Sequence, residues 1–277
     1  MGLQGVARSG RRLDLTLRFG AFAPQGWKLE YSGWNAGDAW ARTVEVSRLA
    51  EDLGYDHLWV YDHVETVPRR EPTHVFEAFT TLAALAQHTQ QIRLGQLVTC
   101  SSYRNAGLLA KEAAGVDVVS GGRLILGLGA GWYEKDYTTY GYDFGTFGSR
   151  FDLFDESLIR IESRLAELIP PPVRNLPILI GGTGPKRSLP AVARHADIWH
   201  AFQDLDAFRK SSDRVDELAA TFGRNGADIE RSTLWENADS ADAFREAGVT
   251  LFQTELTADD GYDLTSLKQV LTWRDNG

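Results

Sequence analysis

The neighbouring residues Asp62 and His63 are the pair in this chain best suited to acid–base chemistry. An imidazole exchanges a proton near neutral pH, and a carboxylate can fix its tautomer. The pair follows the apolar run 57–61, so we expect it at the carboxyl end of a strand. Because neighbours on a strand point to opposite sides, the two side chains need not touch, and each could face a ligand. An Asp-turn beside a solvated histidine is the alternative interpretation.

Two glycine-rich segments offer places where the backbone can approach a ligand closely. Segment 127–131 partly matches a dinucleotide fingerprint, but it lacks the third glycine at the required spacing. It therefore predicts a flat ligand against the backbone, or tight strand-to-helix packing. Segment 181–184 enters a helix, where free amide groups can hold an anion and Lys186 or Arg187 would add charge. An ordinary strand–helix loop with exposed basic residues is the alternative.

Short apolar runs alternate with helical patterns along the chain, which implies parallel strands joined by crossovers. A (β/α)8 barrel is the economical closure, and it gathers the strand ends at one mouth. An open doubly wound sheet is the alternative. Asp38 is the predicted N-cap of the first helix, which Gly54 ends. The predicted strands are 15–22, 57–61, 92–98, 124–128, 177–180, 197–200, 233–235 and 249–253.

Composition narrows the class of protein further. The 277 residues are 43% hydrophobic, and we interpret 1–277 as one domain. A formal charge of −9 argues against a nucleic-acid or membrane partner. The single Cys100 excludes a disulfide framework, and with no His/Glu metal motif we expect no metal. Residues 1–14 lack the apolar stretch of a signal peptide, so we expect a flexible end and a cytoplasmic protein.

The chain resembles the luciferase-like (bacterial luciferase-type) oxidoreductases that use flavins and deazaflavins. Within this family, the sequence is most similar to the branch that uses coenzyme F420, a deazaflavin, and less similar to the flavin mononucleotide (FMN) branch. This resemblance implies a (β/α)8 barrel, often a homodimer, with the deazaflavin ring across the mouth. The segments that carry it are 53–63, 97–105 with 109–114, 120–132, and 177–182 with 193–199.

The resemblance also implies site residues. Asp62 and His63 match the pair that lines the ring near its reacting carbon, and His63 is the candidate proton donor. A cis peptide near Leu97–Val98 would press on the back of the ring, and segment 181–184 would contact the phosphate-bearing tail. The residues predicted to bind the cofactor are Leu97, Val98, Thr99, Cys100, Gly129, Ala130, Gly131, Tyr137, Gly181, Gly182, Thr183, Gly184 and Lys186.

The chain departs from the resemblance in one long insertion. After the fourth helix only residues 169–176 precede the next strand, where the family usually carries an excursion that helps cover the substrate. Segment 233–247 also looks shortened. We therefore expect a mouth that is open, or covered by residues 27–34.

Three functions remain from these patterns. The first is a coenzyme F420-dependent oxidoreductase that transfers hydride between the deazaflavin and a C=C, C=N or C=O group of a small substrate. The second is an FMN-dependent two-component monooxygenase that needs a partner enzyme to reduce its cofactor. The third is a cofactor-free binding or partner subunit. The intact Asp62–His63 pair and the glycines at 181–182 favour an active site.

Overall fold

The computed structural model describes residues 16–256 and 264–276; the predicted flexible end 1–14 lies outside these residues. Every strand pairing is parallel, and the sheet closes because β3 and β4 both pair with β5. β3 and β4 are two halves of one barrel strand, so the barrel has the eight strands predicted. The strands are β1 Arg18–Phe22, β2 His57–Val60, β3 Arg93–Gln96, β4 Thr99–Cys100, β5 Leu124–Gly129, β6 Ile178–Gly181, β7 Ile198–His200, β8 Glu230–Leu234 and β9 Val249–Thr254.

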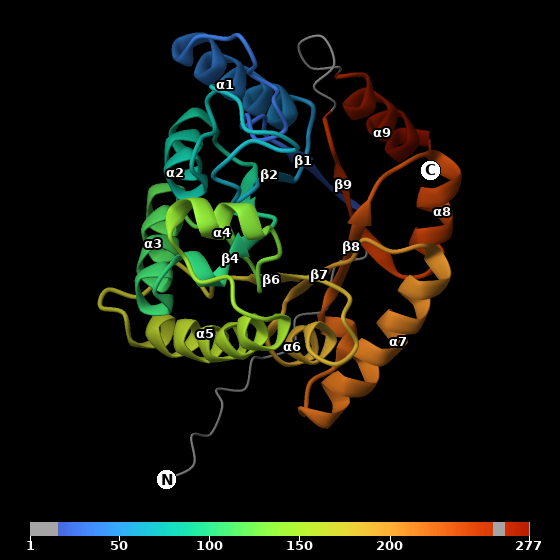
Figure 1. Ribbon diagram of the computed structural model, residues 1–277. Helices are drawn as coiled ribbons and strands as arrows, with labels where there is room; N and C mark the ends of the chain where they lie inside the picture. The colour runs from blue at the N-terminus through green and yellow to red at the C-terminus, as the bar shows by residue number, and fades with distance from the viewer. Residues whose placement is uncertain (1–15, 257–263, 277) are drawn as a thin grey trace.

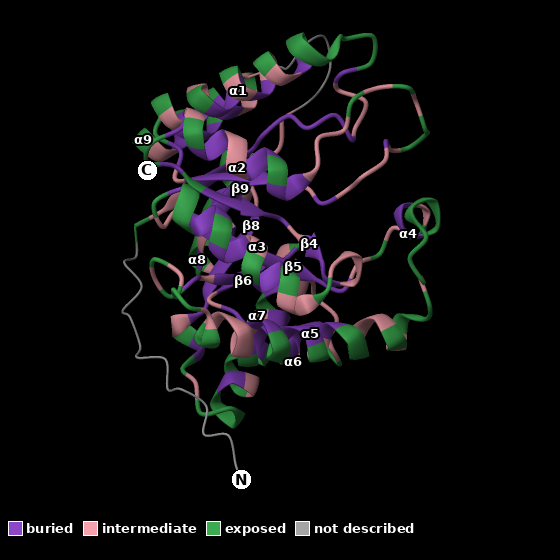
Figure 2. Ribbon diagram, turned by 90° about the vertical axis from the view of Figure 1, so that its left-hand side faces the viewer, coloured by how far each residue is buried: buried purple, intermediate pink, exposed green. Residues whose placement is uncertain are grey.

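Helices surround the barrel, and the connections at the carboxyl ends of the strands gather on one side of it, which Figures 1 and 2 show from two directions. The helix α4 stands on that side, at the right of the view in Figure 2. No described helix is long and apolar enough to cross a membrane. The helices are α1 Ala36–Asp52, α2 Ala78–His88, α3 Ala106–Val119, α4 Glu134–Tyr140, α5 Phe147–Glu167, α6 Ser188–His195, α7 Leu205–Thr221, α8 Ala238–Glu246 and α9 Thr265–Asn276.

Alternation along β2 sorts its side chains between the barrel interior and the surrounding helices. Leu58 belongs to the cluster beneath the helices, whereas Trp59 belongs to a separate cluster inside the barrel. A Cβ on Gly20 or Gly95 would clash with the indole of Trp59, so these two glycines make room for it. By the same alternation, residues 61 and 63 face the mouth and residue 62 faces outward.

Three local features differ from the sequence predictions. Asn35, not Asp38, caps α1, because the Asn35 side chain accepts a hydrogen bond of 2.9 Å from the Asp38 amide. β8 begins at Glu230 rather than at residue 233, because Arg18 neutralises the buried Glu230 carboxylate, with Nε and Oε1 2.9 Å apart. The helix α4 was not predicted. The connection from α5 to β6 spans only residues 168–177, so the insertion is short as expected.

Candidate active site

His63 is held from two directions at the mouth of the barrel. Its Nδ1 lies 2.7 Å from Oδ2 of Asp136, a fully buried residue of α4. Its ring stacks on Trp27 from the connection after β1, with centroids 4.2 Å apart and planes 15° from parallel. With Nδ1 facing a carboxylate, Nε2 is the ring atom that remains to exchange a proton with a ligand. The carboxylate beside His63 is therefore Asp136, which sequence reasoning missed.

Asp62 lies on the outer side of the same strand end. Arg104 binds its carboxylate through two hydrogen bonds of 2.7 and 2.9 Å, and the Cys100 amide donates a third of 2.9 Å. Arg104 also donates to Glu77, at the start of α2, over 2.6 Å. Burial raises the pKa of Asp62, and the positive charge of Arg104 opposes that shift. The Asp62 carboxylate thus anchors the backbone of β4, and a direct catalytic role for Asp62 stays a prediction.

The peptide between Leu97 and Val98 is cis, as the resemblance led us to expect, and it separates β3 from β4. Val98 projects toward the facing strands β5 and β6. A Cβ on Gly129 would clash with the Val98 side chain, and one on Gly181 would lie 3.2 Å from it. These glycines therefore allow an apolar bulge at the mouth, against which a flat ring can lie.

Four of the predicted cofactor residues meet beside this bulge. The Cys100 Sγ lies 3.0 Å from the Tyr137 hydroxyl, which donates to the Ala130 carbonyl over 3.2 Å. Gly131 has a φ of +78°, and a Cβ there would clash with the Tyr137 hydroxyl. Burial raises the pKa of Cys100 to about 11, so the thiol is neutral. Cys100 packs here as an inert thiol rather than as a nucleophile.

The loop 181–184 lies further along the mouth. Its Gly182 has a φ of +122°, and its carbonyl accepts a hydrogen bond of 2.8 Å from the Trp199 indole. Lys186 is exposed beside this loop. The guanidinium of Arg187 instead binds two carboxylates of α5, Asp152 and Asp155, at 2.7 and 2.8 Å. Arg187 is thus held by two aspartates of α5, and its contribution to an anion site stays a prediction.

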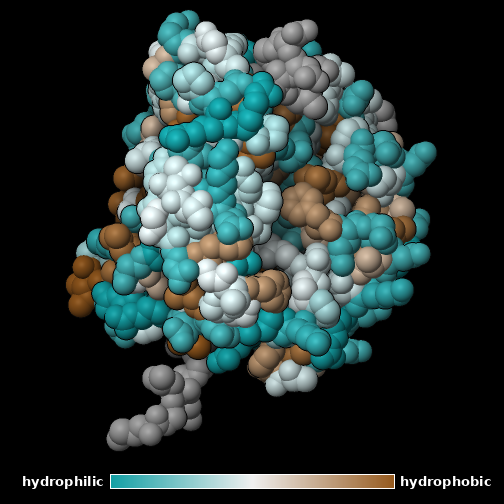
Figure 3. Space-filling model, in the orientation of Figure 1, coloured by the Kyte–Doolittle hydropathy of each residue, from teal (hydrophilic) through white to brown (hydrophobic). Residues whose placement is uncertain are grey.

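Two polar side-chain atoms inside the barrel, His200 Nε2 and Gln253 Oε1, have no hydrogen-bond partner among the described residues. Thr99 Oγ1 also has none, but Thr99 is paired in register with Leu128, which packs beneath the helices, so its side chain faces away from the mouth. His200 Nδ1 lies 2.9 Å from the Ser232 hydroxyl, and burial lowers the pKa of His200 to about 3, so its ring is neutral. These atoms keep free hydrogen-bonding capacity inside the barrel, beneath the mouth. The apolar bulge at Val98, with the glycines that face it, fits a planar deazaflavin or flavin ring. Figure 3 shows that this face of the molecule is hollowed near its centre.

Comparison with known proteins agrees with this geometry. The sequence profile of the luciferase-like monooxygenase family matches residues 17–236. The chain belongs to the luciferase-like monooxygenase family. It is 36% identical over 90 residues to 5,10-methylenetetrahydromethanopterin reductase of Methanolobus tindarius, over 32% of this chain and 25% of that one. It is 32% identical over 117 residues to F420-dependent glucose-6-phosphate dehydrogenase of Amycolatopsis mediterranei, over 42% of this chain and 34% of the relative.

These alignments span only about a quarter to a third of the length of the two curated relatives. Solved structures of the family share the fold over a larger part. An F420-dependent secondary alcohol dehydrogenase superposes with a TM-score of 0.73 at 17% identity, covering 87% of this chain and 93% of that one. The monooxygenase RslO1 from Streptomyces bottropensis superposes with a TM-score of 0.74 at 16% identity, covering 92% and 98%.

Proposed function

We propose that this member of the family is a coenzyme F420-dependent oxidoreductase that acts on a small organic substrate. The observation that carries the proposal is His63, oriented by Asp136 and Trp27 at the same mouth that holds the Val98 bulge. F420-dependent enzymes among the relatives support the choice of cofactor.

The chain would hold the cofactor along one side of the mouth. The Val98 bulge with Gly129 and Gly181 would support the back of the ring. Loop 181–184 and Lys186 would hold the anionic tail. When bound, the deazaflavin supplies hydride chemistry.

His63 would manage the proton. Its Nε2 would donate a proton to the substrate or accept one from it, while the Asp136 carboxylate stabilises the protonated imidazole from Nδ1. Trp27 covers one face of the His63 imidazole and keeps water away from that face. Holding the substrate beside both groups would supply a large part of the rate.

Titration of the purified chain with F420 and, separately, with FMN tests the proposal. Quenching of tryptophan fluorescence reports binding, because Trp27 and Trp132 both lie against His63. We expect F420 to bind at least about tenfold more tightly than FMN, a difference of about 1.4 kcal/mol. Equal and weak binding of both cofactors contradicts the proposal.

An FMN-dependent monooxygenase is the second candidate, because 4-hydroxyprotoasukamycin monooxygenase of Streptomyces nodosus is 30% identical over 131 residues. Oxygen consumption with reduced FMN distinguishes it, and that activity would require a partner reductase. Binding of neither cofactor would favour the cofactor-free subunit.

We further propose that the protein is a cytoplasmic homodimer. Sedimentation tests the dimer, and cell fractionation tests the location.

A further inference from the structure

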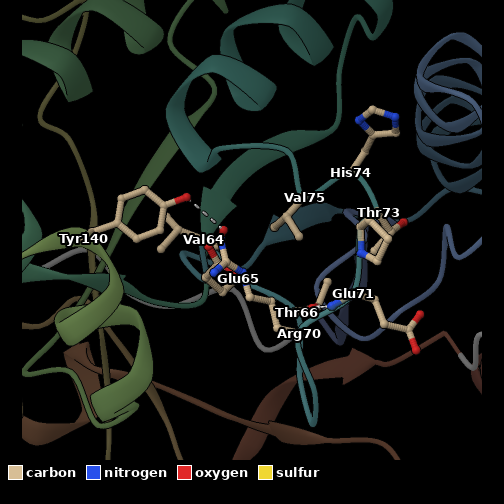
Figure 4. Close-up of a pocket in the computed structure, with 10 residues that line it drawn as sticks. Val64, Glu65, Thr66, Arg70, Glu71, Thr73, His74, Val75 and Tyr140 are labelled. Carbon is tan, nitrogen blue, oxygen red and sulfur yellow. Dashed lines mark hydrogen bonds and ion pairs between the residues drawn. The ribbon is translucent and has the colours of Figure 1, made fainter.

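The connection from β2 to α2, residues 61–77, carries His63 close to its start. A cavity of about 650 Å³ lies beside this connection, lined by residues 64–66 and 70–75 and by Tyr140 (Figure 4). The Tyr140 hydroxyl donates to the Val64 carbonyl over 3.4 Å at its wall. Because an open cavity supplies no packing atoms, it cannot fix the direction of the connection. The position of His63 must therefore be set from another side.

That other side faces β1, where regular strand pairing stops just before His63. The Ala23 amide donates to the Trp59 carbonyl over 2.8 Å, at the end of the pairing between β1 and β2. Tyr61 presents its N–H and C=O to the same side, because strand backbone repeats every two residues. The β1 chain turns away at Pro24, so a main-chain partner for Tyr61 is replaced by a side chain.

The carboxamide of Gln25 takes the place of that missing strand. Its Oε1 accepts a hydrogen bond of 2.8 Å from the Tyr61 amide, and its Nε2 donates one of 2.8 Å to the Tyr61 carbonyl. A carboxamide carries the same kinds of donor and acceptor as a peptide group, so it continues the pairing by one residue. Gln25 thus holds the backbone two residues before His63.

Gln25 also binds the far end of the connection. Its Nε2 donates a second hydrogen bond of 2.5 Å to the Phe76 carbonyl, and the Phe76 amide donates to the Gln25 carbonyl over 3.0 Å. The Gln25 side chain is fully buried, so water does not replace these bonds. One buried side chain therefore joins the start of the connection, at Tyr61, to its end.

The residues after Gln25 reach His63 itself. Gly26 has a φ of +99°, and a Cβ there would clash with the His74 carbonyl, so the chain passes close to the connection. The Trp27 carbonyl accepts a hydrogen bond of 2.7 Å from the Val67 amide. The Trp27 ring then stacks on His63, with centroids 4.2 Å apart. Gln25 therefore anchors both the strand end that carries His63 and the loop that carries its stacking partner.

We propose that Gln25 is a positioning residue that sets the place and tilt of the His63 imidazole at the mouth. It acts through the backbone of Tyr61 and through Trp27. Without its carboxamide, three buried backbone groups of Tyr61 and Phe76 lose their partners, and the strand end moves to pair them elsewhere. The consequence for proton transfer rests on the proposed function, whereas the orientation of the ring does not.

The stack of His63 on Trp27 gives a signature that needs neither cofactor nor substrate. The face of an indole shields protons that lie over it, so the ring protons of His63 should resonate upfield of those of an unstacked histidine. The chain has six histidines, which a proton–carbon correlation spectrum of the labelled imidazoles resolves, and His63→Ala identifies the signal. Gln25→Met keeps the length of the side chain without its polar atoms. We expect the His63 signal to lose most of its upfield displacement in this variant.

Arg123→Met is the matched control. Arg123 is also a clamp on backbone carbonyls, since it donates to Ala86 and Ile92 over 2.8 and 2.9 Å, but it precedes β5 at the end of the barrel away from the mouth. Urea denaturation should show that both variants lose stability, whereas only Gln25→Met should move the His63 signal. An unmoved signal in Gln25→Met, or an equal movement in both variants, overturns the proposal.

A shorter amide covers the case in which Gln25→Met does not fold. The Asn side chain in Gln25→Asn is one methylene too short to make all three hydrogen bonds, and the same outcomes then decide. Titration with F420 separates this proposal from the proposed function. A His63 signal that moves in a chain that binds no F420 upholds the role of Gln25 and refutes the function. An unmoved signal in a chain that binds F420 does the reverse.

Discussion

Asp62 and His63 are neighbours in the chain, yet they belong to two clusters on opposite sides of β2. The outer cluster pairs Asp62 with Arg104, which also bonds to Glu77 and ties the strand end to α2. The inner cluster pairs His63 with Asp136 and leaves Nε2 at the mouth. The charged side chains on the outer side pair with one another and stabilise the fold. On the inner side, His63 remains able to exchange a proton. The predictions below test this division.

The largest effect is expected at His63. His63→Ala should lower kcat about 10²- to 10⁴-fold, because the proton would have to come from water. Stability should also fall, because the variant leaves the buried Asp136 carboxylate without its imidazole partner. Single-turnover hydride transfer and thermal unfolding measure the two quantities. Full turnover in this variant would remove His63 as the proton donor.

On the outer side, Arg104→Met should act on stability. The change leaves the buried Asp62 carboxylate without its cation, which should lower the free energy of unfolding by about 3–5 kcal/mol. Urea denaturation measures it. Arg104→Lys keeps the charge but loses the paired hydrogen bonds, so its loss should be smaller. If Arg104→Met unfolds at the same urea concentration as the unaltered chain, the outer cluster does not hold the fold.

Acid should lower the free energy of unfolding through His200, which is buried inside the barrel. Its folded pKa of about 3 lies below the ordinary 6.5, so below pH 6.5 only the unfolded chain takes up the proton. Stability from this group is complete above pH 6.5 and falls until about pH 3. The free energy of unfolding should drop by about 2 kcal/mol between pH 7 and pH 5. His200→Gln should remove that part of the pH slope, and an unaltered slope would contradict the assignment.

The smallest effect is expected from Asp136→Asn. The amide cannot stabilise the protonated imidazole, so kcat should fall about tenfold while KM for the substrate stays the same. Asp136→Glu, which keeps the carboxylate, is the control and should recover part of the loss. A rise in KM with unchanged kcat would show that Asp136 shapes the pocket rather than orienting His63.

Much of the fold follows from local patterns in the sequence. The apolar runs predicted the strands, and the glycines of segment 127–131 predicted a close backbone approach, whereas the bulge at Leu97–Val98 was expected only from the family resemblance. The predicted start of β8 was too late because Glu230 and Arg231 are polar residues, which do not look like part of a buried strand. The buried Glu230 carboxylate is stabilised by Arg18 of β1, a contact that the local sequence does not reveal. The helix α4 had a signal that could have been used: Gly141 directly follows it with a φ of +78°, a common helix end.

The sequence by itself determined the barrel and the opposite directions of Asp62 and His63, because alternation along a strand is a local property. Only the tertiary structure decided which side chain pairs with each of them. Asp136 lies 73 residues from His63, and Arg104 lies 42 residues from Asp62. Such pairs form only when the barrel assembles and brings the ends of β2, β4 and β5 together. A carboxylate that is adjacent in sequence can therefore be remote from the histidine it seemed to serve.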